Sequence, residues 1–264
     1  MMTYRADIEQ ARQTRLRRRR LTFLTGLSAA LLIGAVSGYV YWQSLFSNMP
    51  ALPDTDELWT RKREFSLDLM NADGERIFHR GPVFGEMVDP ETLPDHVTQA
   101  FLAGEDKRFY DHKGADITAI FRAGFANWRA GQTVQGGSTL TQQVIKNVLL
   151  TPEQSIKRKA QEMTLALELE QRLSKNEILS LYLNRIYLGN RAYGVDGAAE
   201  AYFNKDASEL TLAEATFIAS LPKAPSRMIS DPDLEDAKAR QQYILSQMVD
   251  EDYITLEEAQ AAAK

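Results

Sequence analysis

The sequence predicts a mainly α-helical protein with one N-terminal transmembrane helix and a small β-hairpin. Residues 21–42 form an uncharged apolar stretch behind an arginine-rich N-terminus. The segment around Asp73 and Gly74 alternates apolar and polar residues about a turn signal. From Pro94 onwards, residues that start and stop helices recur at helical spacing. These three observations indicate a membrane-spanning part, a short strand-forming part and a large helical body.

The composition excludes several kinds of site. Of the 264 residues, 44% are hydrophobic and 25% charged, which is typical of a globular chain with one substantial core. The first twenty residues carry a net charge of +5, so the rest carries −10 to give the total of −5, and an acidic body argues against a nucleic-acid partner. Cysteine is absent, which removes disulfides, thiolate nucleophiles and cysteine-ligated zinc. The three histidines, His79, His96 and His112, lack metal-ligand spacing, so we expect no protein-built metal site.

The apolar stretch at 21–42 is long enough to cross a bilayer. At about 1.5 Å per residue, a helix of this length spans the roughly 30 Å hydrocarbon layer. Tyr39, Tyr41 and Trp42 stand at its far end as interfacial anchors, and the arginines precede its near end. The positive-inside rule therefore places the N-terminus in the cytoplasm and the body outside. A cleaved signal peptide is the alternative, but the stretch is long and no clear small-residue cleavage site follows.

We expect five segments along the chain. They are a cytoplasmic basic tail at 1–20, the transmembrane helix at 21–42, a juxtamembrane linker with the hairpin at 43–80, a main helical domain at 81–230 and a C-terminal helical extension at 231–264.

Two features place the linker and the hairpin within residues 43–80. Pro50 and Pro53 indicate a linker over 44–58. The alternating residues 65–78 indicate two short strands joined at the Asp73-Gly74 turn.

Capping residues predict the helices of the body. The first runs from Pro94 to the charged run near 105, and the second covers 116–130 and stops at Gly131. Further helices are expected at 138–147 after the Gly136-Gly137 turn, at 151–172 behind a Thr151/Gln154 capping box, at 174–189 behind Ser174 and Glu177, at 211–222 behind Thr211 and Glu214, and twice within 231–264, where Thr255 and Glu258 cap the last.

The run at 104–116, GEDKRFYDHKGAD, is the first candidate for chemistry. It places the adjacent rings of Phe109 and Tyr110 among many charges. If the rings pack inward, Glu105 comes to lie beside apolar surface, and partial burial makes a carboxylate a more effective proton acceptor. Glu105 is therefore the first candidate for a general base. The alternative is an ion-paired helix end without a catalytic role.

The run GGSTLTQQ at 136–143 is the second candidate. Two glycines, two hydroxyls and the amides of Gln142 and Gln143 meet at a predicted helix start. Free backbone N–H groups and the helix dipole favour an anion there, and phosphate is the expected one. Lys146 lies one turn further on the same face and adds a cation. A helix merely capped by Ser138 or Thr139 is the alternative.

The helix at 151–172 supplies a second candidate carboxylate. Arg158 and Glu162 are four residues apart on one face, and the residues after Glu162 become apolar. Glu162 therefore stands at the border of the core, where a second site acid would be placed. A solvated, salt-bridged helix face is the alternative.

One short pattern matches a different class of enzyme, but we do not expect it to have that function here. Ser220 to Lys223 matches the SxxK pattern of penicillin-interacting serine enzymes, and Ser174 to Asn176 matches SxN. No KTG follows, and SxxK is short enough to arise by chance, so we expect no β-lactam-type site.

Five stretches together resemble a known family. In their order and separations, they resemble the five motifs of the peptidoglycan glycosyltransferase domain, glycosyltransferase family 51, of class A penicillin-binding proteins. The stretches are EDKRFYDHKG, GGSTLTQQ, RKAQE, KNEILSLYLN and RAYGVDGAAEAYF. The resemblance covers about residues 84–226 and assigns this function to the domain at 81–230. It implies a lysozyme-like, mainly α-helical fold, and a chain that stops before the transpeptidase domain with which class A proteins usually continue.

The resemblance also implies roles for individual residues. Glu105 matches the general base, and Glu162 matches the second glutamate, which orients the reacting groups and assists at the leaving diphosphate. Thirteen residues fall where the family binds substrate or completes its motifs: Asp106, Phe109, His112, Ser138, Thr139, Gln142, Gln143, Lys146, Asn147, Arg158, Lys159, Arg191 and Lys223.

The implied reaction polymerises lipid II into β-1,4 glycan strands with release of undecaprenyl diphosphate. Lipid II, the growing lipid-linked glycan, the bacterial inner membrane and other cell-wall synthesis proteins are the implied partners. The resemblance implies no required cofactor. It leaves open whether Mg²⁺ or Mn²⁺ binds at the diphosphate.

Two positions depart from the family. Gln154 stands where an arginine that helps to hold the donor diphosphate is usual, and Asn204 stands where glycine is common. We expect the first to weaken donor binding unless Lys157 substitutes, and the second to be tolerated because Asn reaches left-handed conformations. A lytic, lysozyme-like hydrolase and a non-catalytic cell-wall scaffold stay open as alternatives.

Overall fold

The computed structural model describes residues 2–60, 65–74, 76–131, 136–150, 153, 155–230 and 234–264. The chain forms two compact units. One comprises Met1–Met49 with Ser155–Gln161, and the other comprises Pro50–Gln154 with Glu162–Lys264.

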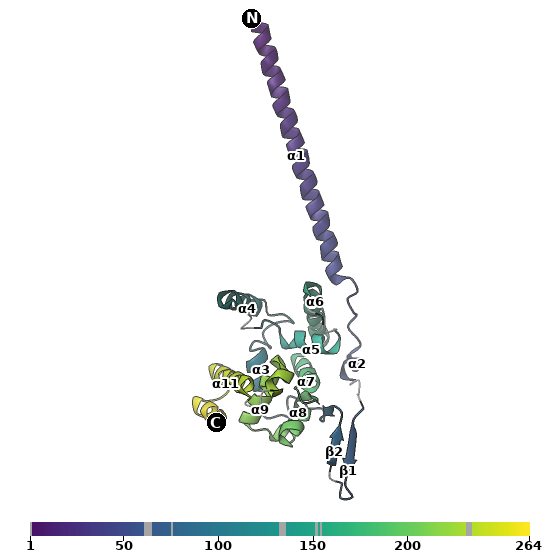
Figure 1. Cartoon of the computed structure of the whole chain (residues 1–264), viewed down its shortest axis with the longest axis vertical. Coiled ribbons are helices and arrows are strands. Elements are labelled where there is room, and N and C mark those ends of the chain that lie inside the picture. The colour runs from purple at the N-terminus through teal and green to yellow at the C-terminus, as the bar shows by residue number, and fades with distance from the viewer. Residues whose placement is uncertain are drawn as a thin grey trace. The chain divides into compact units, whose positions relative to one another are not determined.

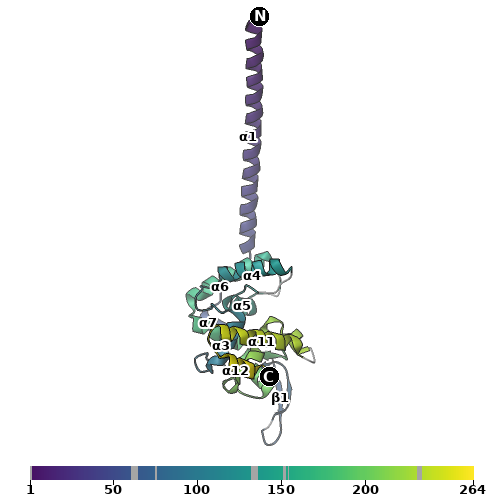
Figure 2. The same ribbon diagram turned by 90° about the vertical axis from the view of Figure 1, so that its left-hand side faces the viewer.

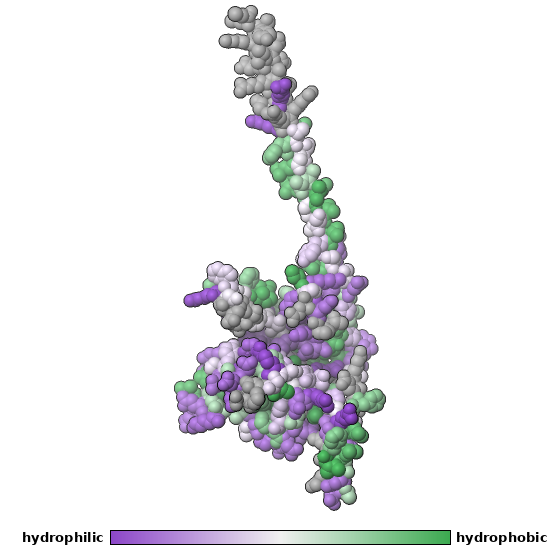
Figure 3. Space-filling view, in the orientation of Figure 1, coloured by the Kyte–Doolittle hydropathy of each residue, from purple (hydrophilic) through white to green (hydrophobic). Residues whose placement is uncertain are grey.

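The first unit is dominated by one continuous helix, α1 (Met2–Phe46). Its portion Arg20–Phe46 is long and apolar enough to cross a membrane, as predicted for residues 21–42. Figure 3 shows apolar residues, in green, along the coloured part of this helix. At the end of the helix, Ser47 accepts hydrogen bonds from Lys157 Nζ at 2.8 Å and, through its carbonyl, from Gln161 Nε2 at 3.2 Å. These contacts join α1 to the start of α6 (Ile156–Arg172).

The second unit has an all-helical core. In it α3 (Asp95–Glu105) packs against α9 (Leu212–Ser220) and α11 (Glu235–Asp250), while α5 (Leu140–Val148) packs against α7 (Lys175–Arg185). Figures 1 and 2 show α3 and α11 side by side from two directions. Phe101 and Tyr182 are fully buried at the centre, with their rings edge to face and their centroids 6.0 Å apart. The end of α3 is thereby fixed from several sides.

The remaining elements lie around these helices. They are α2 (Thr55–Trp59), β1 (Leu67–Met70), β2 (Arg76–Arg80), β3 (Val83–Phe84), α4 (Ile117–Ala130), β4 (Ala192–Tyr193), α8 (Gly194–Phe203), η1 (Ala207–Glu209), η2 (Leu221–Lys223), α10 (Pro225–Ser230) and α12 (Leu256–Ala262). The predicted hairpin is confirmed: β1 and β2 pair antiparallel, with Gly74 at a positive φ in the turn. The parallel pair of β3 and β4 was not predicted, because each strand has only two residues.

Most predicted helix ends are confirmed by their caps. Asp116 caps α4 by accepting a hydrogen bond from Ala119 N, and Gly131 ends it in the left-handed conformation. Capping boxes start α7, α9 and α12 at the predicted serine and threonines. Asn204 ends α8 with φ of 53°, the left-handed conformation expected of Asn at this turn.

Several boundaries differ from the predictions. The cap of α5 is Thr139, so this helix starts at Leu140, and α7 ends at Arg185, before the turn that contains Gly189. α6 starts at Ile156. The predicted start of this helix depended on Thr151, Pro152 and Gln154, and the expected loss of a cation depended on Gln154. These three residues lie outside the described residues.

The predicted linker at 44–58 contains more structure than expected. α2 forms within it, and Leu52 and Leu58 are buried. The carbonyl of Leu58 also accepts a hydrogen bond from the Arg185 guanidinium at 2.6 Å. Apolar burial and this bond hold the segment against the helical body, which its prolines did not indicate.

Gly114→Ala should destabilise the protein strongly. Gly114 has φ of +84°, and a Cβ there would lie 2.8 Å from the backbone of Ala166. Left-handed strain and overpacking together predict a loss of about 2 to 4 kcal/mol in the free energy of unfolding. Gly124→Ala, in a helix and with open space around it, should instead stabilise by about 0.5–1 kcal/mol. Thermal unfolding of the two variants, followed by circular dichroism, checks both signs; equal effects would contradict the close packing.

Candidate active site

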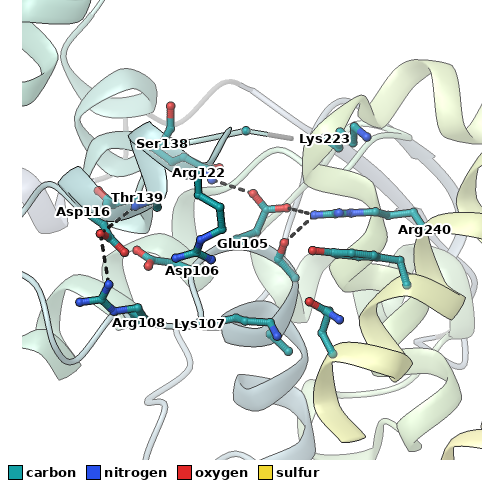
Figure 4. A pocket seen from close by; sticks show the side chains of 18 of the residues that line it. Glu105, Asp106, Lys107, Arg108, Asp116, Arg122, Ser138, Thr139, Lys223 and Arg240 are labelled. Atoms are coloured by element: carbon teal, nitrogen blue, oxygen red, sulfur yellow. Dashed lines mark hydrogen bonds and ion pairs between the residues drawn. The ribbon is translucent and has the colours of Figure 1, made fainter. Parts of the chain in front are cut away.

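A cavity of about 930 Å³ opens in the second unit. Its wall comprises the end of α3 and the loop after it, α4, the segment before α5, η2, α10 and α11. Four acids line it, Glu105, Asp106, Asp116 and Asp236, and so do six cations, Lys107, Arg108, Arg122, Lys223, Arg227 and Arg240. Figure 4 shows most of these side chains around the cavity. The excess of cations suits an anionic ligand.

Glu105 is held in this cavity at both carboxylate oxygens. As the last residue of α3, it is carried at the end of a helix whose buried face includes Ala100, Phe101 and Leu102. Oε2 accepts a hydrogen bond from Gln143 Nε2 at 2.7 Å, and Oε1 accepts one from the Arg240 guanidinium at 3.2 Å (Figure 4). The carboxylate is only 11% exposed.

Gln143 is itself oriented by a buried tyrosine. Its Oε1 accepts a hydrogen bond from the Tyr182 hydroxyl at 3.5 Å. Burial raises the pKa of Tyr182 well above its ordinary value, and the charge of Glu105 raises it further. The hydroxyl therefore stays protonated and donates, which leaves the amide nitrogen of Gln143 to face Glu105.

Three residues of the first two motifs form a buried scaffold beside the cavity. Asp106 Oδ2 accepts hydrogen bonds from Leu140 N and His112 Nε2, both at 2.9 Å. Thr139 caps α5 and donates to the carbonyl of Gly114 at 2.7 Å. Asp106 and Thr139 also line the cavity, so a substrate contact for them stays a prediction, whereas His112 does not occur among the described lining residues.

The aromatic pair behaves only partly as predicted. Phe109 is fully buried, and Lys175 Nζ lies 4.5 Å from its ring centroid. Tyr110, in contrast, is 56% exposed, so the expectation that both rings pack inward is wrong for this residue. Its hydroxyl can reach the surface residue Asn176, to which it donates at 3.2 Å, and this contact satisfies the hydroxyl without burial.

Asp116 anchors the α4 side of the cavity. It accepts hydrogen bonds from the Thr118 hydroxyl at 2.5 Å and Ala119 N at 3.0 Å, and Arg108 lies 3.6 Å away. Burial alone would raise the pKa of Asp116, but these hydrogen bonds and the Arg108 guanidinium hold it below its ordinary value. An ionised Asp116 thus fixes both the start of α4 and Arg108.

Among the remaining predicted site residues, Ser138, Gln143 and Lys223 line the cavity, whereas the following do not. Lys146 and Asn147 are exposed on α5, Gln142 is buried in its capping box, and Arg191 is exposed in the loop before β4. Glu162 is buried on α6. Arg158 and Lys159 belong to the other unit, where Ser155 caps their helix, so their pairing with Glu105 and Glu162 stays a prediction.

The serine of the SxxK pattern is inaccessible. Ser220 is fully buried and donates to the carbonyl of Phe217 at 2.7 Å, which does not suit a nucleophile. Within the described ranges, no group of three or more His, Asp or Glu side chains could hold a metal ion.

Comparison with known proteins decides the family. The model of the family described as Transglycosylase matches residues 75–249, which is well over half of the chain. The chain belongs to the transglycosylase family. The match starts before the region of the predicted resemblance and continues to the end of α11.

The chain is also similar to named penicillin-binding proteins. The chain is 46% identical over 215 residues to penicillin-binding protein 1A of Neisseria flavescens and 43% identical over 233 residues to that of Escherichia coli K12, covering 81% and 88% of this chain. It spans 27% of the length of each. A crystal structure of penicillin-binding protein 1A from Haemophilus influenzae aligns with 75% of this chain and 20% of its own, at 30% identity and a TM-score of 0.42.

The transglycosylase motifs did not reveal Arg240, the cation nearest to Glu105. It lies on α11, in the segment predicted as an extension at 231–264. Ala237, Ile244 and Met248 are buried on this helix, and Arg240 follows Ala237 by three residues and therefore lies on the same face. The sequence did contain a signal for Arg240. The helical period predicts an apolar residue at this position, and a charged residue stands there instead.

Asp116→Asn should reduce stability near neutral pH only. Because the folded pKa of Asp116 is lowered, its charge contributes stability above the unfolded pKa of about 3.9, and this contribution is lost as the pH falls through the folded pKa. Asn keeps a cap acceptor but not the charge, so we expect a loss of about 1 kcal/mol at pH 7. Urea unfolding of parent and variant at pH 7 and pH 3 checks this; a difference of the same size at both pH values would contradict it.

Proposed function

We propose that this chain is a membrane-anchored peptidoglycan glycosyltransferase that polymerises lipid II into β-1,4 glycan strands and releases undecaprenyl diphosphate. The observation that carries the proposal is the carboxylate of Glu105, held in a cavity lined by six cations in a member of the transglycosylase family. A base surrounded by cations suits a sugar donor whose leaving group is a diphosphate.

In the proposed reaction, Glu105 takes the proton from the 4-hydroxyl of the acceptor sugar. The oxygen forms a bond to the anomeric carbon of the donor as the bond from that carbon to the diphosphate breaks, with inversion. General-base help contributes about 10²–10⁴-fold. The departing diphosphate needs charge stabilisation more than a proton, and fixed cations supply it without reorganisation.

Other predicted residues take supporting roles in this proposal. Glu162 orients the reacting groups near the diphosphate. Ser138, Gln143 and Lys223 line the cavity, and in this proposal they contact the substrate. Lys146, Asn147, Arg158 and Lys159 hold the donor sugar and diphosphate, and Arg191 completes the last motif.

Exposed apolar side chains on α4 support a membrane location for the second unit. Ile117, Phe121, Phe125 and Trp128 recur at helical spacing, and all are exposed. An apolar helix face with Trp at one end is typical of a helix that lies in a membrane interface. Since both substrates carry lipid tails, we propose that the protein sits in the bacterial inner membrane with its N-terminus in the cytoplasm and this body outside, near other cell-wall synthesis proteins.

The hydrolase and the scaffold, the two alternatives, would require different site residues from those of a glycosyltransferase. A lysozyme-like hydrolase also uses one glutamate, but cleavage of a neutral sugar bond does not need six cations around the cavity. A non-catalytic scaffold does not need a glutamate held at both oxygens in an open cavity. Neither alternative accounts for both features.

Glu105→Gln should abolish polymerisation. Given lipid II, residues 1–264 in detergent should form long glycan strands on a gel, and the variant should be slower by about 10²–10⁴-fold because it lacks the base. Glu257→Gln, at an exposed position on α12, is the matched control and should behave as the parent. Unchanged polymerisation by Glu105→Gln would refute its role, and degradation of finished peptidoglycan by the parent would favour the hydrolase.

Trp128 should contact lipid. In a variant with Trp42→Phe and Trp59→Phe, Trp128 is the only remaining tryptophan of the three. Reconstituted into vesicles with brominated lipids, its fluorescence should be quenched relative to vesicles of ordinary lipids. Equal fluorescence in both vesicles would show that α4 stays in water.

A further inference from the structure

We propose that Arg240 is a positioning residue for Glu105, so that α11 completes the active site from outside the sequence motifs. The inference rests on the proposed function, because it assigns a role towards the base of that reaction. It rests on the contacts of Arg240, on the packing of α11 against the end of α3, and on the position of an arginine in a buried helix face.

The contacts of Arg240 fix both the side chain and the backbone that present the base. One guanidinium nitrogen, Nη2, lies 2.5 Å from the carbonyl oxygen of Gly104 and 3.2 Å from Glu105 Oε1. The Gly104 carbonyl belongs to the last turn of α3, where carbonyls lack partners within the helix. Arg240 therefore holds the end of the helix and the carboxylate together.

Gln143 and Arg240 hold the carboxylate of Glu105 from two different helices. Gln143 on α5 donates to Oε2, and Arg240 on α11 donates to Oε1. Figure 4 shows Arg240 reaching Glu105 from the α11 side of the cavity. With one donor on each oxygen, rotation of the carboxylate is restricted. Each oxygen keeps a lone pair for the acceptor hydroxyl.

α11 is docked closely enough to make this contact precise. A Cβ on Gly104 would lie 3.1 Å from Ile244, so the glycine allows the two helices to approach. Lys107, in the loop after α3, pairs with Glu251 at the end of α11 at 3.0 Å. The ring of Tyr243 lies 4.7 Å from the guanidinium carbon of Arg240 and supports it by a cation–π contact.

The site is not arranged for stability alone. Arg240 Nε is buried and has no hydrogen-bond partner among the described residues. An unpaired buried donor costs stability, and an apolar residue would suit this helix face better, as at Ala237 and Ile244. A role in holding Glu105 gives a reason for an arginine at this position.

Steady-state kinetics of residues 1–264 on lipid II test the proposal. Arg240→Gln should lower kcat by about 10- to 100-fold, the size expected when a catalytic group is misplaced, with KM within about twofold of the parent. Arg240→Lys should recover about tenfold of that loss, because a single nitrogen makes both contacts and an ammonium can also donate twice. Unchanged kcat in Arg240→Gln, or a raised KM with kcat unchanged, would overturn the proposal.

Two further variants separate positioning from folding and charge. Lys238→Gln removes a cation from an exposed position of α11 and should leave kcat unchanged. Gln241→Leu removes hydrogen bonds from α11 to Ala213 and Thr216 on α9, so it should lower the thermal midpoint without the fall in kcat. A fall in kcat in either control equal to that of Arg240→Gln would make the effect of Arg240 structural or general.

The parent and Glu105→Gln distinguish the two levels of failure. If the parent does not polymerise lipid II, the proposed function fails. If the parent polymerises, Glu105→Gln does not, and Arg240→Gln keeps the parent kcat, only the role of Arg240 fails.

Discussion

The arrangement around the cavity depends on one buried carboxylate, that of Asp106. A single oxygen of this side chain accepts from the first N–H of α5 and from His112, and thereby ties the end of α3 to the start of α5. Glu105 precedes Asp106, and Gln143 lies one turn into α5, so this tie sets the distance between the base and its amide partner. Together with the packing of α3 and α5 against their neighbouring helices, this contact fixes the spacing across which Glu105 and Gln143 meet.

The cations in the cavity favour the binding of an anion but repel one another when no anion is bound. Six cations near one cavity repel one another and stabilise an anion that enters. Some are restrained by acids, as Arg108 is by Asp116 and Arg227 is by Asp236 at 3.2 Å. Such pairs hold the side chains in place and reduce the net charge of the empty cavity. The cavity is therefore shaped by ion pairs as well as by packing.

Local chemistry made much of the fold predictable. Caps and left-handed turns depend on a few adjacent residues, so Asp116, Gly131 and the Ser/Thr capping boxes marked helix ends correctly. The base and its amide partner were found because both occur in recognisable motifs. Arg240 was missed since its contact with Glu105 joins residues 135 apart, and α8 and the two-residue strands depend on tertiary packing. The outward position of Tyr110 likewise depends on Asn176, which is distant in sequence.

The contacts at Ser47 have a consequence for shortened forms of the protein. Ser47 supplies acceptors for Lys157 and Gln161, the first of which directly precedes Arg158. A shortened version that begins beyond Ser47 loses these acceptors, so the first turns of α6 lose part of their support. Removing the anchor together with Ser47 therefore changes the environment of a helix that bears two predicted donor-binding cations, as well as the location of the protein. Activity measured on such a fragment would reflect both changes together.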